Sequence, residues 1–216
     1  MVTNRNIDRV IRTLKPLVRR WREPVVGHYK SDPFTTLIGC LLSLRTQDAT
    51  THRACQRLFA LAKTPRAMRQ LAIPAIERAI YPVGFYRTKA RTIRQVCQTL
   101  LEHYDGRVPD ELDELLTIKG VGRKTANLVV TLAFRKPGIC VDTHVHRISN
   151  RWGYVRTKTP EQTEMALRRI LPRRHWIIFN DVLVAFGQNL CHPVSPRCSR
   201  CPLRVVCGRV GVRYSR

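Results

Sequence analysis

Four cysteines lie in one short stretch near the end of the chain. Few explanations other than metal binding account for such a density of cysteines. Their spacing is C-x6-C-x2-C-x5-C, and they are Cys191, Cys198, Cys201 and Cys207. Thiolates this close in sequence can point at one centre, and four sulfurs suit an iron–sulfur cluster or a tetrahedral zinc ion. Only Cys198 and Cys201 form a C-x2-C pair, whereas the common zinc pattern has two such pairs. The spacing therefore leans towards a cluster.

A Gly-Val-Gly turn separates two predicted helices. Gly120, Val121 and Gly122 lie between a helix that ends near Ile118 and one that begins at Arg123. Glycines let the backbone approach a ligand closely, and the N–H groups and dipole of a helix start attract an anion. We therefore predict a helix–hairpin–helix clamp for phosphate. The alternative is that these glycines only end a helix.

Lys124 lies in the first turn of the second of these helices, next to Arg123. The helix dipole and the neighbouring guanidinium both disfavour a further positive charge there. An uncharged amine is a nucleophile that can form a Schiff base at an aldehyde-like carbon. On these physical grounds alone, the simpler interpretation of Lys124 as a phosphate-contacting lysine is favoured.

One carboxylate, Asp142, stands out in the basic stretch Val-Asp-Thr-His-Val-His-Arg. Aspartate caps helix starts well, but it can also act as a general base or stabilise a developing cation. The residues alone do not decide between these roles. His144 and His146 have no acidic or sulfur partner nearby in the sequence, so we favour phosphate contact or packing over metal binding.

The elements that must position these residues are predicted to be helical almost throughout. From 7 to 21, apolar residues recur at spacings of three and four, as in an amphipathic helix. No alternating strand pattern persists, and Gly and Pro punctuate short loops. We therefore predict an all-α fold, with Asp48 capping the third helix. The predicted helices are 7–21, 34–44, 49–58, 65–71, 74–80, 88–103, 110–118, 123–134, 143–152, 159–171 and 176–190.

Composition points to a polyanionic partner. The 216 residues include 39 Lys+Arg and 15 Asp+Glu, for a net charge of +24. Nucleic acid is the favoured partner, and a solvated basic surface is the alternative.

No apolar run approaches the ~20 residues of a membrane span, and the first ten residues lack the apolar core of a secretory signal. We expect the remaining cysteines to be buried, reduced, cytosolic thiols: Cys40, Cys55, Cys97 and Cys140.

Three motifs taken together resemble the endonuclease III family, the bifunctional DNA glycosylases of the helix–hairpin–helix superfamily. They are L-x-x-I-K-G-V-G-R-K-T-A-N at 115–127, V-D-T-H-V-x-R at 141–147 and the cysteine run. The likeness extends from about Val25 to Cys207 with the motifs in the family's order. It implies two helical domains with DNA bound in a cleft between them: a six-helix barrel at 25–136, and an iron–sulfur domain made of 1–24 and 137–216.

The resemblance also implies a mechanism. Lys124 matches the family's catalytic lysine and Asp142 its catalytic aspartate. The four cysteines match the ligands of a [4Fe–4S] cluster, which braces a basic loop. Damaged pyrimidines are flipped out of duplex DNA, Lys124 displaces the base, and β-elimination cleaves the strand at the abasic site.

Base flipping leaves a gap in the duplex, which family members fill from two loops. Arg45 and Phe85 occupy the matching positions, although glutamine is usual at the place of Arg45. Arg45 can stack and read the orphan base, and Phe85 can act as a wedge, with core packing as its alternative. The full set of expected DNA contacts is Gly120, Val121, Gly122, Arg123, Arg45, Phe85, Lys89, His144, Arg197 and Arg200.

Two alternatives remain. One is a monofunctional glycosylase for mismatched bases, whose members usually lack a lysine at the place of Lys124. The other is a non-catalytic DNA-binding module that carries structural zinc. We expect a monomer that acts in the cytoplasm on nucleoid DNA containing damaged bases or abasic sites, with no membrane partner.

Overall fold

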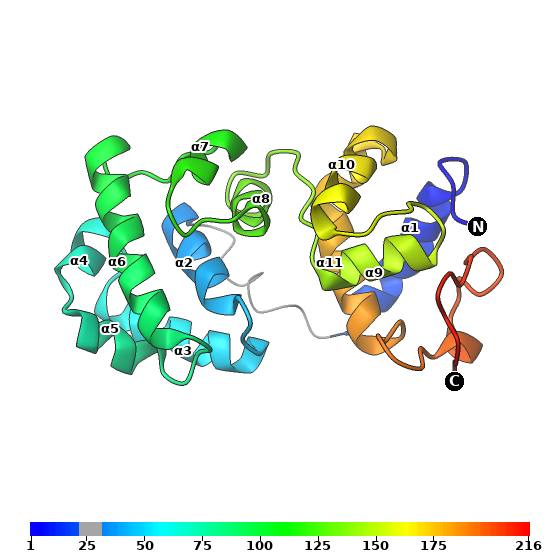
Figure 1. Ribbon diagram of the computed structural model, residues 1–216, viewed down its shortest axis with the longest axis horizontal. Helices are drawn as coiled ribbons and strands as arrows, with labels where there is room; N and C mark the ends of the chain where they lie inside the picture. Colours follow the sequence, from blue (N-terminus) through cyan, green and yellow to red (C-terminus); the bar gives the residue numbers. More distant parts are fainter. Residues whose placement is uncertain (22–31) are drawn as a thin grey trace. The chain divides into compact units, whose positions relative to one another are not determined.

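The computed structural model describes residues 1–21 and 32–216, and every regular element in these ranges is a helix (Figure 1). The predicted all-α class is therefore confirmed. The chain forms two compact units, Val25–Lys136 and Met1–Pro24 with Pro137–Arg216. We call them the central unit and the terminal unit. The predicted domain boundary between 24 and 25 lies outside the described residues, and the assignment of the units as barrel and cluster domains stays a prediction.

The central unit is organised around α2 (Pro33–Ser43). This helix is apolar on all sides, the pattern of a buried helix, and Leu37, Ile38 and Leu42 have no exposed surface. Asp32 starts the helix by accepting a hydrogen bond from the Thr35 N–H at 2.8 Å. Helix α2 packs on α3 (Asp48–Leu61), α6 (Tyr86–His103) and α8 (Arg123–Leu132). The other helices of the unit are α4 (Pro65–Gln70), α5 (Ile73–Ile80) and α7 (Leu112–Thr117).

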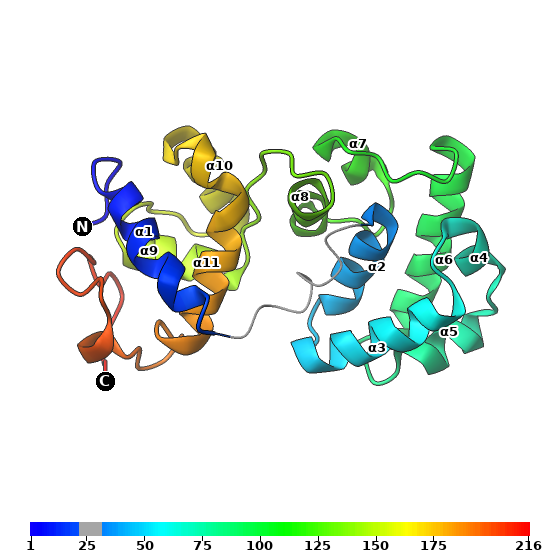
Figure 2. The ribbon, with the colours of Figure 1, turned by 180° about the vertical axis from the view of Figure 1, so that it is seen from behind.

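The terminal unit joins the two ends of the chain. Its core helix α11 (Trp176–Asn189) buries Phe179 and Phe186, and Trp152 packs edge-on against Phe179 with ring centroids 6.4 Å apart. From behind, α1 runs beside α11 (Figure 2), because both belong to one hydrophobic core. The helical segments of this unit are α1 (Ile7–Val18), α9 (Thr143–Arg151), α10 (Pro160–Ile170), η2 (Arg173–His175), α11 and η3 (Cys198–Arg200).

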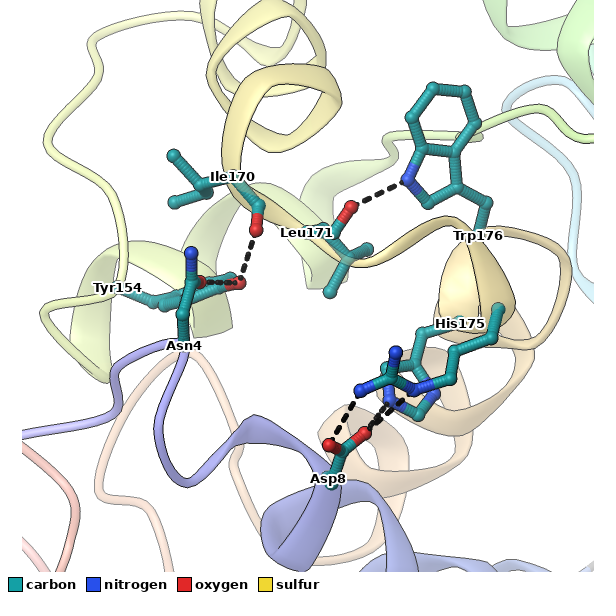
Figure 3. Close-up of polar contacts among 8 residues, drawn as sticks. Asn4, Asp8, Tyr154, Ile170, Leu171, His175 and Trp176 are labelled. Carbon is teal, nitrogen blue, oxygen red and sulfur yellow. Dashed lines mark hydrogen bonds and ion pairs between the residues drawn. The ribbon is translucent and has the colours of Figure 1, made fainter.

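Polar contacts fasten α1 to the turn before α11 (Figure 3). The Asp8 carboxylate accepts hydrogen bonds from Arg174 at 3.0 and 2.6 Å and lies 2.6 Å from His175 Nε2. These bonds, from Arg174 first and His175 second, lower the pKa of Asp8 to about 2. Nearby, the Tyr154 hydroxyl donates to Asn4 Oδ1 at 2.7 Å. The first residues of the chain are thereby tied to its last third.

Several predicted helix ends are corrected by local bonding. Gln47, not Asp48, is the N-cap of α3, and Asp48 is its first helical residue. The helix predicted at 110–118 begins only at Leu112, with Glu111 as its N-cap. The carboxylates of Asp110 and Glu111 pair with Lys136 at 2.8 and 2.5 Å. The first helix ends at Val18, three residues before the predicted end at 21.

No helix in the described ranges combines the length and apolar character needed to span a bilayer.

Candidate active site and metal centre

The predicted hairpin is present between α7 and α8. Gly120 has φ +94°, and a Cβ on it would lie 2.4 Å from the Thr92 side chain, so glycine is required there. Val121 is buried and its N–H donates to the Ile118 carbonyl at 2.9 Å. Gly122 is the N-cap of α8, whose start has no capping side chain. A helix start in this condition suits an anionic ligand.

Lys124 is the second residue of α8 and is exposed, and the neighbouring Arg123 is half-buried. Because α8 packs on α2, the positive charge of Lys124 acts on the buried Cys40 thiol. Burial nevertheless dominates and raises the pKa of Cys40 to about 12, so this thiol is inert. The four cysteines outside the C-terminal run are all buried, as predicted.

Asp142 is the N-cap of α9, and its Oδ1 accepts a hydrogen bond from the Val145 N–H at 2.8 Å. The capping role considered from the sequence is therefore present. It occupies one carboxylate oxygen and leaves the second oxygen for other chemistry. Asp142 belongs to the terminal unit, whereas Lys124 belongs to the central unit.

His144 packs inside the terminal unit. Its Nδ1 lies 3.1 Å from Arg147 Nη2, and a Cβ on Gly187 would lie 2.3 Å from the same nitrogen. The glycine in α11 therefore makes room for this imidazole. Of the two roles predicted for His144, packing is the one that these contacts support.

The four C-terminal cysteines line one cavity, which holds about 420 Å³ of atom-free space and is partly open to solvent. All four are free thiols. In the described part of the chain, no three His, Cys, Asp or Glu side chains are arranged to hold a metal ion. Arg197, at the start of η3, also lines the cavity, and Arg200 at its end is exposed.

Two arginines of α9 hold the first cysteine's loop, and sequence reasoning missed both. Arg147 Nη2 donates to the Cys191 carbonyl at 2.8 Å. The buried Arg151 donates to the carbonyls of His192 and Pro193 at 2.5 Å each and lies 3.5 Å from Cys191 Sγ. Their spacing of four residues places both arginines on one helix face. This spacing is the feature of the sequence that could have predicted their shared contact. Cationic donors beside thiolates fit a negatively charged metal centre.

Arg45 and Phe85 come together although they lie 40 positions apart in the sequence. The Arg45 guanidinium carbon stands 5.6 Å from the centroid of the Phe85 ring. Phe85 is 62% exposed, which contradicts the alternative that it packs in the core. The pair is therefore presented to solvent, as a wedge requires.

Lys89, one of the predicted DNA contacts, makes contacts inside the protein. Its ammonium donates to the carbonyls of Leu42 and Leu44 at 2.8 and 2.6 Å and lies 3.3 Å from Thr46 Oγ1. Burial lowers its pKa to about 8. All three donors of the ammonium therefore have acceptors within the central unit.

The sequence of the chain matches known repair proteins. The model of the HhH-GPD superfamily of base excision DNA repair proteins matches residues 38–173. Endonuclease III of Thermotoga maritima is 46% identical over 181 residues, which cover 84% of this chain and 85% of that protein. The chain belongs to the endonuclease III family.

Solved endonuclease III structures share the fold. A non-covalent endonuclease III–DNA complex matches with a TM-score of 0.86 at 36% identity and covers 96% of both chains. A trapped endonuclease III–DNA covalent intermediate matches with a TM-score of 0.85 at 35% identity, with the same coverage. The predicted family and its enzyme class, a DNA glycosylase and abasic-site lyase of base excision repair, are confirmed. The alternative of a non-catalytic zinc module is thereby set aside.

Proposed function

We propose that this chain removes oxidised pyrimidines from duplex DNA and cleaves the strand at the abasic site, with Lys124 as nucleophile and Asp142 as its acid–base partner. The observation that carries the proposal is the position of Lys124. It is the second residue of α8, directly after the Gly120–Gly122 turn, in a chain of the endonuclease III family. The trapped covalent complex of a relative supports a nucleophile of this kind.

The chemistry proceeds in two stages. The Lys124 amine attacks C1′ of the flipped nucleotide, the glycosidic bond breaks, and the base leaves. Asp142 accepts the proton that the new C–N bond releases and stabilises the positive charge that develops on the sugar. The C1′–O4′ bond then breaks as the proton held by Asp142 passes to O4′, which opens the sugar and gives the Schiff base. The Schiff base acidifies the C2′ proton, whose loss breaks the C3′–O bond. Water then hydrolyses the imine and regenerates the amine.

DNA contacts are proposed for the remaining predicted residues that face outward. The hairpin turn and Arg123 would bind one phosphate at the start of α8. Arg200, and Arg197 beside the cavity, would bind others, because arginine matches phosphate geometry. The proposed partner is duplex DNA with a damaged base or abasic site, bound by a monomer at the nucleoid in the cytoplasm.

The four cysteines are proposed to hold a [4Fe–4S] cluster. Free thiols around one cavity, with Arg147 and Arg151 beside them, fit that group. Zinc ligands converge to about 2.3 Å from one ion, whereas thiolates around a four-iron body stand further apart. When bound, the cluster would cross-link Cys191 to the loop that carries Arg197 and Arg200.

Borohydride trapping tests the lysine. Wild-type protein mixed with abasic duplex DNA and borohydride should give a covalent adduct, and Lys124→Gln should give none while it still binds the DNA. Lys119→Gln, which changes a neighbouring exposed lysine, is the matched control and should be trapped normally. A wild-type protein that releases the base without an adduct would instead be a monofunctional glycosylase.

Metal analysis tests the cysteines. Purified wild-type protein should be brown and contain about four iron and four sulfide per chain. Cys198→Ser should lower the iron content, whereas Cys97→Ser, a change in the buried core of the central unit, should not. Colourless protein with one bound zinc would contradict the cluster.

A further inference from the structure

Arg45 and Phe85 share an unusual backbone. Both have left-handed conformations, with φ +52° and +59°. Neither is a glycine, so each conformation costs about 1 kcal/mol or more, and such strain persists only where surrounding contacts impose it. Since both side chains are exposed, core packing does not supply those contacts. Something else must hold the two loops in this form.

The Lys89 ammonium is the first of these contacts. It comes from the first turn of α6, where the helix dipole disfavours a cation, and it reaches the carbonyls of Leu42 and Leu44 at the end of α2. The last turn of α2 has no basic residue of its own, so Lys89 supplies the positive charge that this helix end favours. The contact binds the loop before Arg45 to the helix after Phe85.

Thr46 and Gly84 form a second contact between the same two loops. The Gly84 N–H donates to Thr46 Oγ1 at 3.2 Å, and Lys89 shares that oxygen. A Cβ on Gly84 would lie 2.7 Å from the Arg45 carbonyl oxygen, closer than real Cβ contacts. Only glycine therefore permits the two loops to lie this close.

We propose that Lys89 is a positioning residue, which with Thr46 and Gly84 joins loops 44–47 and 81–85 into one rigid wedge. Arg45 and Phe85 would then enter the duplex as a unit, with the guanidinium held over the ring towards the orphan base. This inference rests on the proposed function, because it assumes that the chain opens duplex DNA. It gives Lys89 a part in lesion recognition without any contact to DNA.

A fluorescence assay tests the wedge without relying on Lys124. The probe is duplex DNA with 2-aminopurine opposite a tetrahydrofuran abasic analogue, and its fluorescence reports the stacking of the orphan base. Wild type should change the fluorescence on binding. Lys89→Met, which keeps the aliphatic stem, should reduce that change roughly tenfold at saturation. Lys63→Met, at an exposed lysine of the same unit, should behave as wild type.

Three further measurements separate positioning from general structural damage. Gly84→Ala should reproduce the Lys89→Met defect, since it pushes the loops apart without changing charge. Trapping on single-stranded abasic DNA, which has no orphan base, should stay within about twofold of wild type in both variants. Phe85→Ala combined with Lys89→Met should be no worse than either change alone, because both disable one unit.

The proposal is overturned by a normal fluorescence change in Lys89→Met, by losses that multiply in the double variant, or by equal loss on single-stranded and duplex DNA. Failure of the proposed catalytic function looks different. In that case wild type forms no trapped adduct on either substrate, while the fluorescence comparison still reports on the wedge.

Discussion

Lys124 and Lys89 show how two lysines in similar local positions acquire different roles. Each lies in the first turn of a helix, where a cation is disfavoured. Lys124 is exposed beside a turn that suits phosphate, whereas Lys89 turns back to carbonyls at the end of α2. The difference comes from the neighbouring backbone and not from the residue type.

Arg45→Gln is expected to change the choice of orphan base. Arginine only donates hydrogen bonds and matches O6 and N7 of guanine, whereas glutamine matches N6 and N7 of adenine. Wild type should therefore favour a lesion opposite guanine, and the variant should shift that ratio towards adenine by roughly tenfold. Single-turnover base release from paired duplexes measures the ratio. An unchanged ratio would show that Arg45 does not read the orphan base.

At the scale of elements, α9 combines two tasks in nine residues. Its start is formed by Asp142, the proposed catalytic carboxylate. One turn and two turns further on, Arg147 and Arg151 hold the loop of the first cysteine. The helix and its cap therefore carry both the proposed catalytic carboxylate and the contacts to the cysteine loop.

Asp142→Asn separates capping from catalysis. Asparagine caps a helix as well as aspartate does, so the melting temperature should stay close to that of wild type. Base release should nevertheless slow by roughly a hundredfold or more, because the general base is lost. Asp142→Ala is the comparison, since it should also cost about 1 kcal/mol of stability. If Asp142→Asn retains full activity, Asp142 is a structural cap only.

The link between α1 and η2 is expected to weaken in acid. The pKa of Asp8 is lowered to about 2 by Arg174 and His175, so its stabilising effect is present above about pH 4 and is lost as pH falls towards 2. Asp8→Asn should therefore melt below wild type at pH 6, and the two curves should converge near pH 2. The exposed Glu114→Gln is the control. A difference that persists unchanged at pH 2 would rule out this ion pair as its cause.

At the scale of the whole molecule, the net positive charge is larger than the charge of the residues proposed to contact DNA. The net charge of +24 is spread over both units, and the stretch after Cys191 has six arginines and no acid. Such a surface attracts a polyanion over long range and releases counterions on binding. Affinity for DNA should therefore depend strongly on salt.

The salt dependence of binding checks this electrostatic contribution. The slope of log affinity against log salt should be about −0.9 per phosphate neutralised, measured by fluorescence anisotropy with undamaged duplex DNA. Arg200→Ala should make the slope shallower by about 0.9 and weaken binding equally for different sequences. A slope that does not respond to this change would remove Arg200 from the DNA contacts.

Features with local causes could be predicted from the sequence alone. Helix periodicity, Pro33 at a helix start and the positive φ of Gly120 at a turn depend on bonds within about four residues. The C-terminal cysteines could also be predicted as one metal site, because they are close together along the chain. The all-α class and the positions of Lys124 and Asp142 at helix starts followed from these signals.

The inward turn of Lys89 and the pairing of Arg45 with Phe85 could be decided only by the tertiary structure. The acceptors of Lys89 lie 45 and 47 positions earlier in the chain, and the reach of Arg151 to His192 spans 41. Contacts at such separations depend on how whole helices pack, and helix packing is set by many distributed apolar residues rather than by any local pattern. Sequence thus determined which residues could do chemistry, and packing determined which of them are presented and which are used internally.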